Sequence, residues 1–147
     1  MANEHDYPNL TAENYRITSP RDPKYNCVAW AAGSSDTWWE CTKGYYWPVD
    51  YPTSPSVNAL KDAYAALGFV ECDNSNLEPG FEKLAIYALN EEYMHAARQL
   101  PNGWWTSKLG PDEDIEHQTL EALLNRDYAR IACIMRRPIP ALTSTSR

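Results

Sequence analysis

Long apolar runs, closely paired cysteines and an excess of basic residues are all missing from this chain of 147 residues. No run approaches the roughly 20 apolar residues of a membrane-spanning helix. The opening residues, MANEHDYPNL, have neither the basic nor the apolar region of a secretory signal. The sequence therefore predicts a cytoplasmic protein, unless another route exports it, with no membrane partner.

Basic residues are too few for a nucleic-acid partner. Thirteen Lys and Arg stand against twenty Asp and Glu, which gives a net charge of −7. A field of that sign repels phosphate groups and anionic lipid surfaces. We expect no nucleic-acid partner, and the sequence carries no indication of the oligomeric state.

The four cysteines are widely spaced. Cys27, Cys41, Cys72 and Cys133 form no CxxC pair, so zinc-ribbon and thioredoxin sites lose their main support. Without a secretory signal, free thiols are favoured over disulfides. A metal site that combines one of these thiols with His95 has no spacing in its favour, and we expect neither a metal nor a cofactor.

The order of expected elements predicts one α+β domain over residues 1–147. Residues 1–25 contain three prolines and read as an extended arm, whereas residues 138–147 read as a flexible tail. Helices are expected at 28–32, 54–68 and 118–124, and strands at 69–72, 83–89, 93–100, 104–109 and 128–136. Leu60 and Leu67 share the apolar face of the clearest helix, so both should lie in the core.

The segment 25–33 (YNCVAWAAG) resembles the start of a short helix with a cysteine in its first turn. Asn26 is a good N-cap, and Gly33 can end the helix. The positive end of the helix dipole should favour the thiolate of Cys27. The alternative is that Cys27 is simply a small buried residue on a core helix.

His95 is the most suitable base for that thiol. It begins an expected strand, with Tyr93, Ala97 and Gln99 on its face. A histidine within reach of Cys27 would act first as general base and then as general acid on the leaving amine. His5 lies in the arm, and His117 follows an acidic run where a solvated helix end explains it.

These residues resemble the papain-like cysteine hydrolases of the NlpC and CHAP type. The segments NCVAWAAG, LEPGFEKLAIYA and HAARQLPNGWWTSKLGPDEDIEH are similar to a family of small bacterial proteins assigned to that superfamily, over about residues 7–137. The resemblance implies a papain-like α+β fold with N-terminal helices packed on a mostly antiparallel sheet. It also implies that Cys27 and His95 face each other across a helix–sheet cleft.

The resemblance places a third polar residue, which orients the imidazole, about twelve positions after the catalytic histidine. That position is Ser107, a departure from the usual histidine, and serine stabilises an imidazolium less than a carboxylate does. Asp114 is the charged alternative, followed by Glu116, although their run also reads as a solvated acidic turn. The backbone N–H of Cys27, with Asn14 or Arg21, would supply the oxyanion hole.

Candidate substrate-binding residues cluster around an aromatic loop. Residues 34–53 are rich in Trp and Tyr, and such a loop forms either a packed lid or a wall of a cleft. Basic side chains near the histidine could bind a substrate carboxylate, or could be cross-strand partners. The candidates are Asn26, Trp38, Trp39, Trp47, Arg98 and Lys108.

Two functions follow from these features. The first is a cysteine hydrolase that acts on the amide bond of a peptide, protein or glycopeptide, as a peptidase, amidase or deamidase. The alternative is a catalytically weak papain-like scaffold that serves as a protein-binding or immunity module, with the aromatic loop as its interface.

Overall fold

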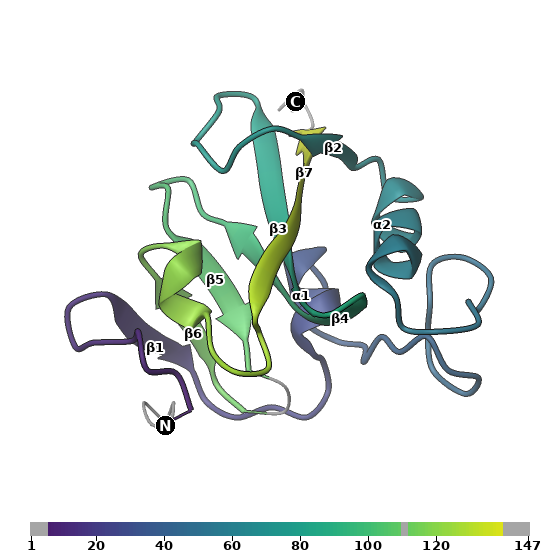
Figure 1. Ribbon diagram of the computed structural model, residues 1–147, viewed down its shortest axis with the longest axis horizontal. Coiled ribbons are helices and arrows are strands. Elements are labelled where there is room, and N and C mark those ends of the chain that lie inside the picture. Colours follow the sequence, from purple (N-terminus) through teal and green to yellow (C-terminus); the bar gives the residue numbers. More distant parts are fainter. Residues whose placement is uncertain (1–5, 110–111, 140–147) are drawn as a thin grey trace, which may run out of the picture.

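The computed structural model describes residues 6–109 and 112–139, and one seven-stranded sheet runs through them (Figure 1). The strand order is β1-β6-β5-β4-β3-β7-β2, and every neighbouring pair is antiparallel. The strands are β1 (Tyr15–Ser19), β2 (Val70–Cys72), β3 (Phe81–Leu89), β4 (Glu92–Gln99), β5 (Trp105–Lys108), β6 (Asp114–His117) and β7 (Arg130–Pro138).

Helices are short and few in the described part of the chain. They are α1 (Cys27–Ala31), α2 (Val57–Ala65) and the 3-10 turn η1 (Leu120–Leu123). The predicted α+β, papain-like class with N-terminal helices is therefore wrong, because the fold is mainly β. No helix among the described residues is long and apolar enough to cross a membrane.

Two strands that the sequence did not predict account for much of the difference between the expected α+β fold and the observed, mainly β fold. Residues 15–19, predicted as part of an extended arm, form β1, which pairs with β6. The acidic segment 114–117, predicted as a solvated turn, is β6 and pairs on its other side with β5. The predicted helix at 118–124 shrinks to η1. The rest of the arm before residue 6 and the tail after residue 139 lie outside the described residues.

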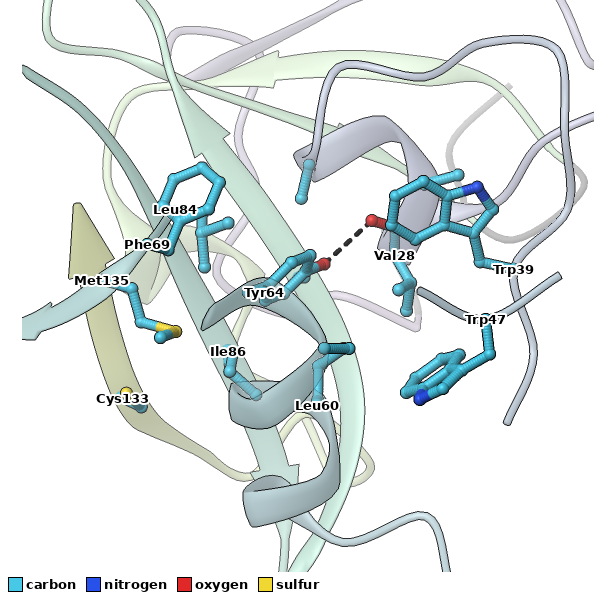
Figure 2. Close-up of a cluster of buried hydrophobic side chains, with 14 of the residues drawn as sticks. Val28, Trp39, Trp47, Leu60, Tyr64, Phe69, Leu84, Ile86, Cys133 and Met135 are labelled. Carbon is cyan, nitrogen blue, oxygen red and sulfur yellow. Dashed lines mark hydrogen bonds between the residues drawn. The ribbon is translucent and has the colours of Figure 1, made fainter. Parts of the chain in front are cut away.

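The sheet is buried on both faces by two separate apolar clusters. The first cluster lies under α1 and α2 and includes Leu84 and Ile86 of β3 (Figure 2). The second lies on the opposite face, under η1, and includes Ala85 and Tyr87. Residues 83–88 are all buried, which confirms the prediction of a strand covered on both sides.

Helix α2 is held to the first cluster by Leu60 and Tyr64, both fully buried. Ser56 caps the helix by accepting a hydrogen bond from the Ala59 N–H at 3.1 Å. The Tyr64 hydroxyl donates to the Val28 carbonyl at 2.9 Å and so ties α2 to α1 (Figure 2). Leu67, predicted to share this core, packs against it but is only partly buried.

Leu60→Ala is therefore expected to lower the free energy of unfolding by about 2–5 kcal/mol, because it opens a cavity in a packed core. Leu67→Ala should cost clearly less, since that side chain keeps part of its surface in water. Urea titrations of the two variants, followed by circular dichroism, measure the difference. Equal losses in the two variants would contradict this account of the core.

A β-bulge in β4 decides which way His95 faces. Tyr87 pairs with His95 and Ala88 pairs with Tyr93, which leaves Met94 without a partner. Tyr93 consequently packs in the first cluster, while His95 contacts Tyr87 on the second face. The predicted shared face of Tyr93 and His95 is wrong, because the extra residue shifts the alternation of side chains by one position.

Candidate functional site

Cys27 is the first residue of α1 and is half-buried. The Asn26 side chain caps the helix by accepting a hydrogen bond from the Ala29 N–H at 3.3 Å, as predicted. The helix lies against β4 and β5. Backbone N–H groups of Ala96, Val28 and Cys27 itself face the sulfur and stabilise its charged form. The nucleophile candidate thus lies next to Ala96, the residue that follows His95.

The Cys27 thiol is neutral at pH 7. Burial raises its pKa from 9.0 to about 11, and the three backbone N–H groups lower it only in part. A helix of five residues has few aligned peptide dipoles to oppose this desolvation. The expectation that the helix favours a thiolate is therefore wrong, because burial outweighs the helix terminus.

His95 is fully buried and contacts Tyr87 and Tyr128 of the second apolar cluster. Its ring stacks on Tyr128, with ring centroids 4.6 Å apart, and lies 5.4 Å from the Tyr87 ring. Its Nε2 atom is 2.9 Å from the Ser107 hydroxyl oxygen. Among the buried side-chain atoms of the described residues, its Nδ1 atom is one of three without a hydrogen-bond partner.

The Ser107 contact continues into a chain of buried polar groups. The Ser107 oxygen is also 2.8 Å from His117 Nε2, and His117 Nδ1 is 2.9 Å from the Thr119 carbonyl oxygen. The prediction that His117 lies at a solvated helix end is wrong, because His117 is fully buried in β6. The four-residue alternation of segment 114–117 was the available signal, but it is too short to separate a strand from a turn.

His95 and His117, the two histidines in this series of hydrogen bonds, are neutral at pH 7. Burial, and then the neighbouring His117, lower the pKa of His95 from 6.5 to about 3. Burial lowers the pKa of His117 from 6.5 to about 4, although the Thr119 carbonyl favours its charged form. Neutral imidazoles keep one lone pair each, so one of them can act as a base.

Cys27 packs against the first cluster, the one that lies under α1. Burial raises the pKa of Tyr64 and Tyr93 in the first cluster and that of Tyr128, which stacks on His95, and an ionised Cys27 would add a smaller effect in the same direction. Strand β5 pairs with β4 only beyond residue 97, so residues 95–97 have no β5 partner among the described residues. No hydrogen bond joins the thiol to the His95 ring within this part of the chain.

The two acidic alternatives for the third residue do not contact His95. The carboxylate of Asp114 accepts hydrogen bonds from Ser19 Oγ at 2.5 Å and from the Tyr25 hydroxyl at 2.6 Å. Glu116 forms a surface ion pair with Arg16 at 2.7 Å. Of the three residues predicted to orient the imidazole, Ser107 is therefore the one that contacts the His95 ring. Its catalytic role stays a prediction.

The aromatic loop is fastened to the nucleophile helix. The Asn26 amide donates to the Trp39 carbonyl at 2.7 Å and accepts from the Trp39 N–H at 3.2 Å. Trp39 and Trp47 are buried in the first cluster, and the Trp38 indole donates to Glu40 at 3.0 Å. Asn26, Trp39 and Trp47 thus pack the loop onto the core, and they do not form an open wall of a cleft.

The predicted basic substrate-binding residues also have partners inside the protein. Arg98 donates to the Trp30 carbonyl at 3.3 Å and lies over the Trp30 ring. Lys108 is fully buried, donates to the Asp22 carbonyl at 2.5 Å and lies 4.7 Å from the centre of the Tyr25 ring. These contacts hold both side chains inside the protein, but the partners lie in α1 and in the segment before it, and they are not the cross-strand partners that the sequence suggested.

The two predicted oxyanion side chains are engaged elsewhere. The Asn14 amide donates to the Asn9 carbonyl at 2.9 Å, and Arg21 pairs with Asp112 at 3.0 Å. The backbone N–H of Cys27, which faces its own sulfur, is the donor that remains at the site. In the described ranges, no group of three or more His, Cys, Asp or Glu side chains is placed to hold a metal ion.

Comparison with known families identifies the domain that carries this site. The model of a domain of unknown function, DUF7689, matches residues 16–136. The chain belongs to the DUF7689 family. The match spans Cys27, His95, Ser107 and His117, so the whole candidate site lies inside the family's domain. Searches of curated proteins and of solved structures found no match. No papain-like, NlpC or CHAP family emerged, and that resemblance stays a prediction.

Proposed function

We propose that the chain is a cysteine hydrolase that cleaves an amide bond, with Cys27 as nucleophile and His95 as base. The observation that carries the proposal is the unpartnered Nδ1 atom of a buried, neutral His95, one residue before the N–H group that faces the Cys27 sulfur. A buried nitrogen without a partner is costly and calls for an explanation, and a catalytic role that receives a proton at this atom supplies one.

The first half of the reaction forms a thioester. His95 Nδ1 takes the thiol proton as the Cys27 sulfur bonds to the substrate carbonyl carbon, and the resulting oxyanion accepts a hydrogen bond from the Cys27 N–H. His95 then gives the same proton to the substrate nitrogen as the carbon–nitrogen bond breaks. Because burial disfavours both the thiolate and the imidazolium, the proton has to move together with bond formation.

The second half returns the enzyme to its starting state. His95 Nδ1 takes a proton from water as the water oxygen attacks the thioester carbon, and the Cys27 sulfur leaves. The imidazolium then returns its proton to the sulfur. A peptidase, an amidase and a deamidase share these steps and differ only in the amine that leaves. A peptide, protein or glycopeptide remains the proposed substrate class.

Alkylation of the native protein by iodoacetamide at pH 7, followed by peptide mapping, tests the proposal. A thiol with the pKa of about 11 that burial gives Cys27 has roughly 100-fold less thiolate than an ordinary thiol. Without help from His95, Cys27 should therefore react slowly. With a working base it should react fastest of the four cysteines.

The other cysteines are internal controls for this experiment. Cys41 and Cys72 are half-buried like Cys27, whereas Cys133 is buried and reports on opening of the fold. Alkylation in urea should modify all four equally, which checks the mapping. If Cys27 is no faster than Cys41 and Cys72 in the native protein, the hydrolase proposal is wrong.

A protein-binding module is the second candidate, and one observation favours it. Tyr45, Tyr46 and Tyr51 of the aromatic loop are about half exposed, at 50%, 49% and 47%. Exposed tyrosines are common anchors of interfaces. This candidate replaces the hydrolase if Cys27 shows no selective reactivity and a triple Tyr→Ala variant of the loop loses a bound partner while it keeps its fold.

A further inference from the structure

We propose that His117 is a positioning residue that fixes the tautomer of His95 through the Ser107 hydroxyl. The three residues lie on β6, β5 and β4, and Thr119 anchors the far end of the chain that they form. The positions of the protons in this series of hydrogen bonds do not depend on the proposed function. Only the role of the free His95 nitrogen as a base rests on that proposal.

The direction of the hydrogen bonds starts at Thr119. A carbonyl oxygen can only accept, so His117 Nδ1, 2.9 Å away, must carry a proton. Burial keeps His117 neutral, so its Nε2 atom carries a lone pair. The Ser107 hydroxyl, 2.8 Å from that atom, therefore donates its only proton to His117.

The same logic determines His95. Because the Ser107 proton is given to His117, the Ser107 oxygen can only accept from His95 Nε2 at 2.9 Å. Neutral His95 then has its proton on Nε2 and its lone pair on Nδ1, the atom without a partner. If these hydrogen bonds ran in the opposite direction, Nδ1 of His95 would carry the proton, and that atom could not receive a proton from a thiol.

Without His117, nothing would hold the Ser107 proton away from His95. The hydroxyl could rotate and donate to His95 Nε2, which would move the imidazole proton to Nδ1. His117→Leu removes the acceptor at nearly constant volume. His117→Gln is the matched control, because its side-chain oxygen can still accept from Ser107.

Nitrogen-15 NMR of the histidine rings at pH 7 tests the inference. Signals are assigned from the single variants His95→Gln and His117→Gln. We expect His95 with a protonated Nε2, and His117 with a protonated Nδ1, in the unaltered protein. His117→Gln should keep the His95 tautomer, whereas His117→Leu should shift His95 toward protonated Nδ1. A protonated Nδ1 on His95 in the unaltered protein would overturn the inference even if His117→Leu does not fold.

Reactivity separates this inference from the proposed function. His117→Leu should slow alkylation of Cys27 by roughly threefold to tenfold, about the effect of one lost neutral hydrogen bond, and His117→Gln should restore most of the rate. In a Ser107→Ala background, His117→Leu should have no further effect on the rate. If the tautomers are as expected but Cys27 is not selectively alkylated, the positioning role stands and the hydrolase proposal fails. An unchanged His95 tautomer in His117→Leu would refute the positioning role.

Discussion

His95→Ala is expected to slow alkylation of Cys27 at pH 7 by about 100-fold or more, the usual contribution of a positioned general base. Burial alone gives the Cys27 thiol a pKa of about 11, so loss of the base leaves almost no thiolate. Rates at Cys41, Cys72 and Cys133 should not change. The measurement is the time course of iodoacetamide labelling at each cysteine, resolved by peptide mapping.

Three variants control for indirect effects of His95→Ala. Leu60→Ala lowers stability and removes no polar group of the site, so it should leave the rate at Cys27 relative to the other cysteines unchanged. Ser107→Ala should slow Cys27 by only threefold to tenfold, about one neutral hydrogen bond. Asp114→Asn should have no effect on the rate, because Asp114 bonds to Ser19 and Tyr25. A larger effect from Asp114→Asn than from Ser107→Ala would show that the carboxylate acts on the imidazole.

The two buried histidines should make the fold sensitive to mild acid. Burial lowers the pKa of His95 to about 3 and that of His117 to about 4, while both return to about 6.5 in the unfolded chain. The unfolded state therefore binds more protons below pH 6.5. The contribution of each histidine is fully present above that pH and is lost as the pH falls toward the folded-state values.

The expected loss is on the order of 4 kcal/mol in the free energy of unfolding between pH 7 and pH 5, shared by the two histidines. Urea titrations across this range measure it. His117→Gln should halve the slope, since glutamine does not titrate. A slope that is the same in His117→Gln and in the unaltered protein would mean that His117 is not held neutral by burial.

Much of the local structure follows from local sequence. Asn26 forms the predicted cap because an amide oxygen can accept a helix N–H. The Asn102-Gly103 turn joins β4 to β5 because Gly103 adopts a φ of +90°, which other residues rarely do. The nearly continuous apolar run in β3 predicts a strand with both faces covered, and the structure confirms it. Each of these depends on neighbours within a few positions.

The contacts among the candidate site residues are harder to predict from the sequence. Ser107 was placed near His95 by its position in a resemblance, and it does contact the ring. His117 was missed because nothing in four residues of acidic sequence shows that β1 will cover one edge of β6 and β5 the other. The bulge at Met94 was missed because alternation of side chains does not reveal an unpaired residue.

The sequence by itself determined where most helices and strands form and which residue types could supply a nucleophile and a base. Only the tertiary structure decided that the fold is mainly β, that His117 is buried behind Ser107, and that the Cys27 thiol is neutral. The physical reason is that short-range propensities act along the chain, whereas desolvation and hydrogen-bond direction depend on which distant segments cover a side chain. Burial by such segments raises the pKa of the Cys27 thiol to about 11, and the residues next to Cys27 in the sequence do not indicate this.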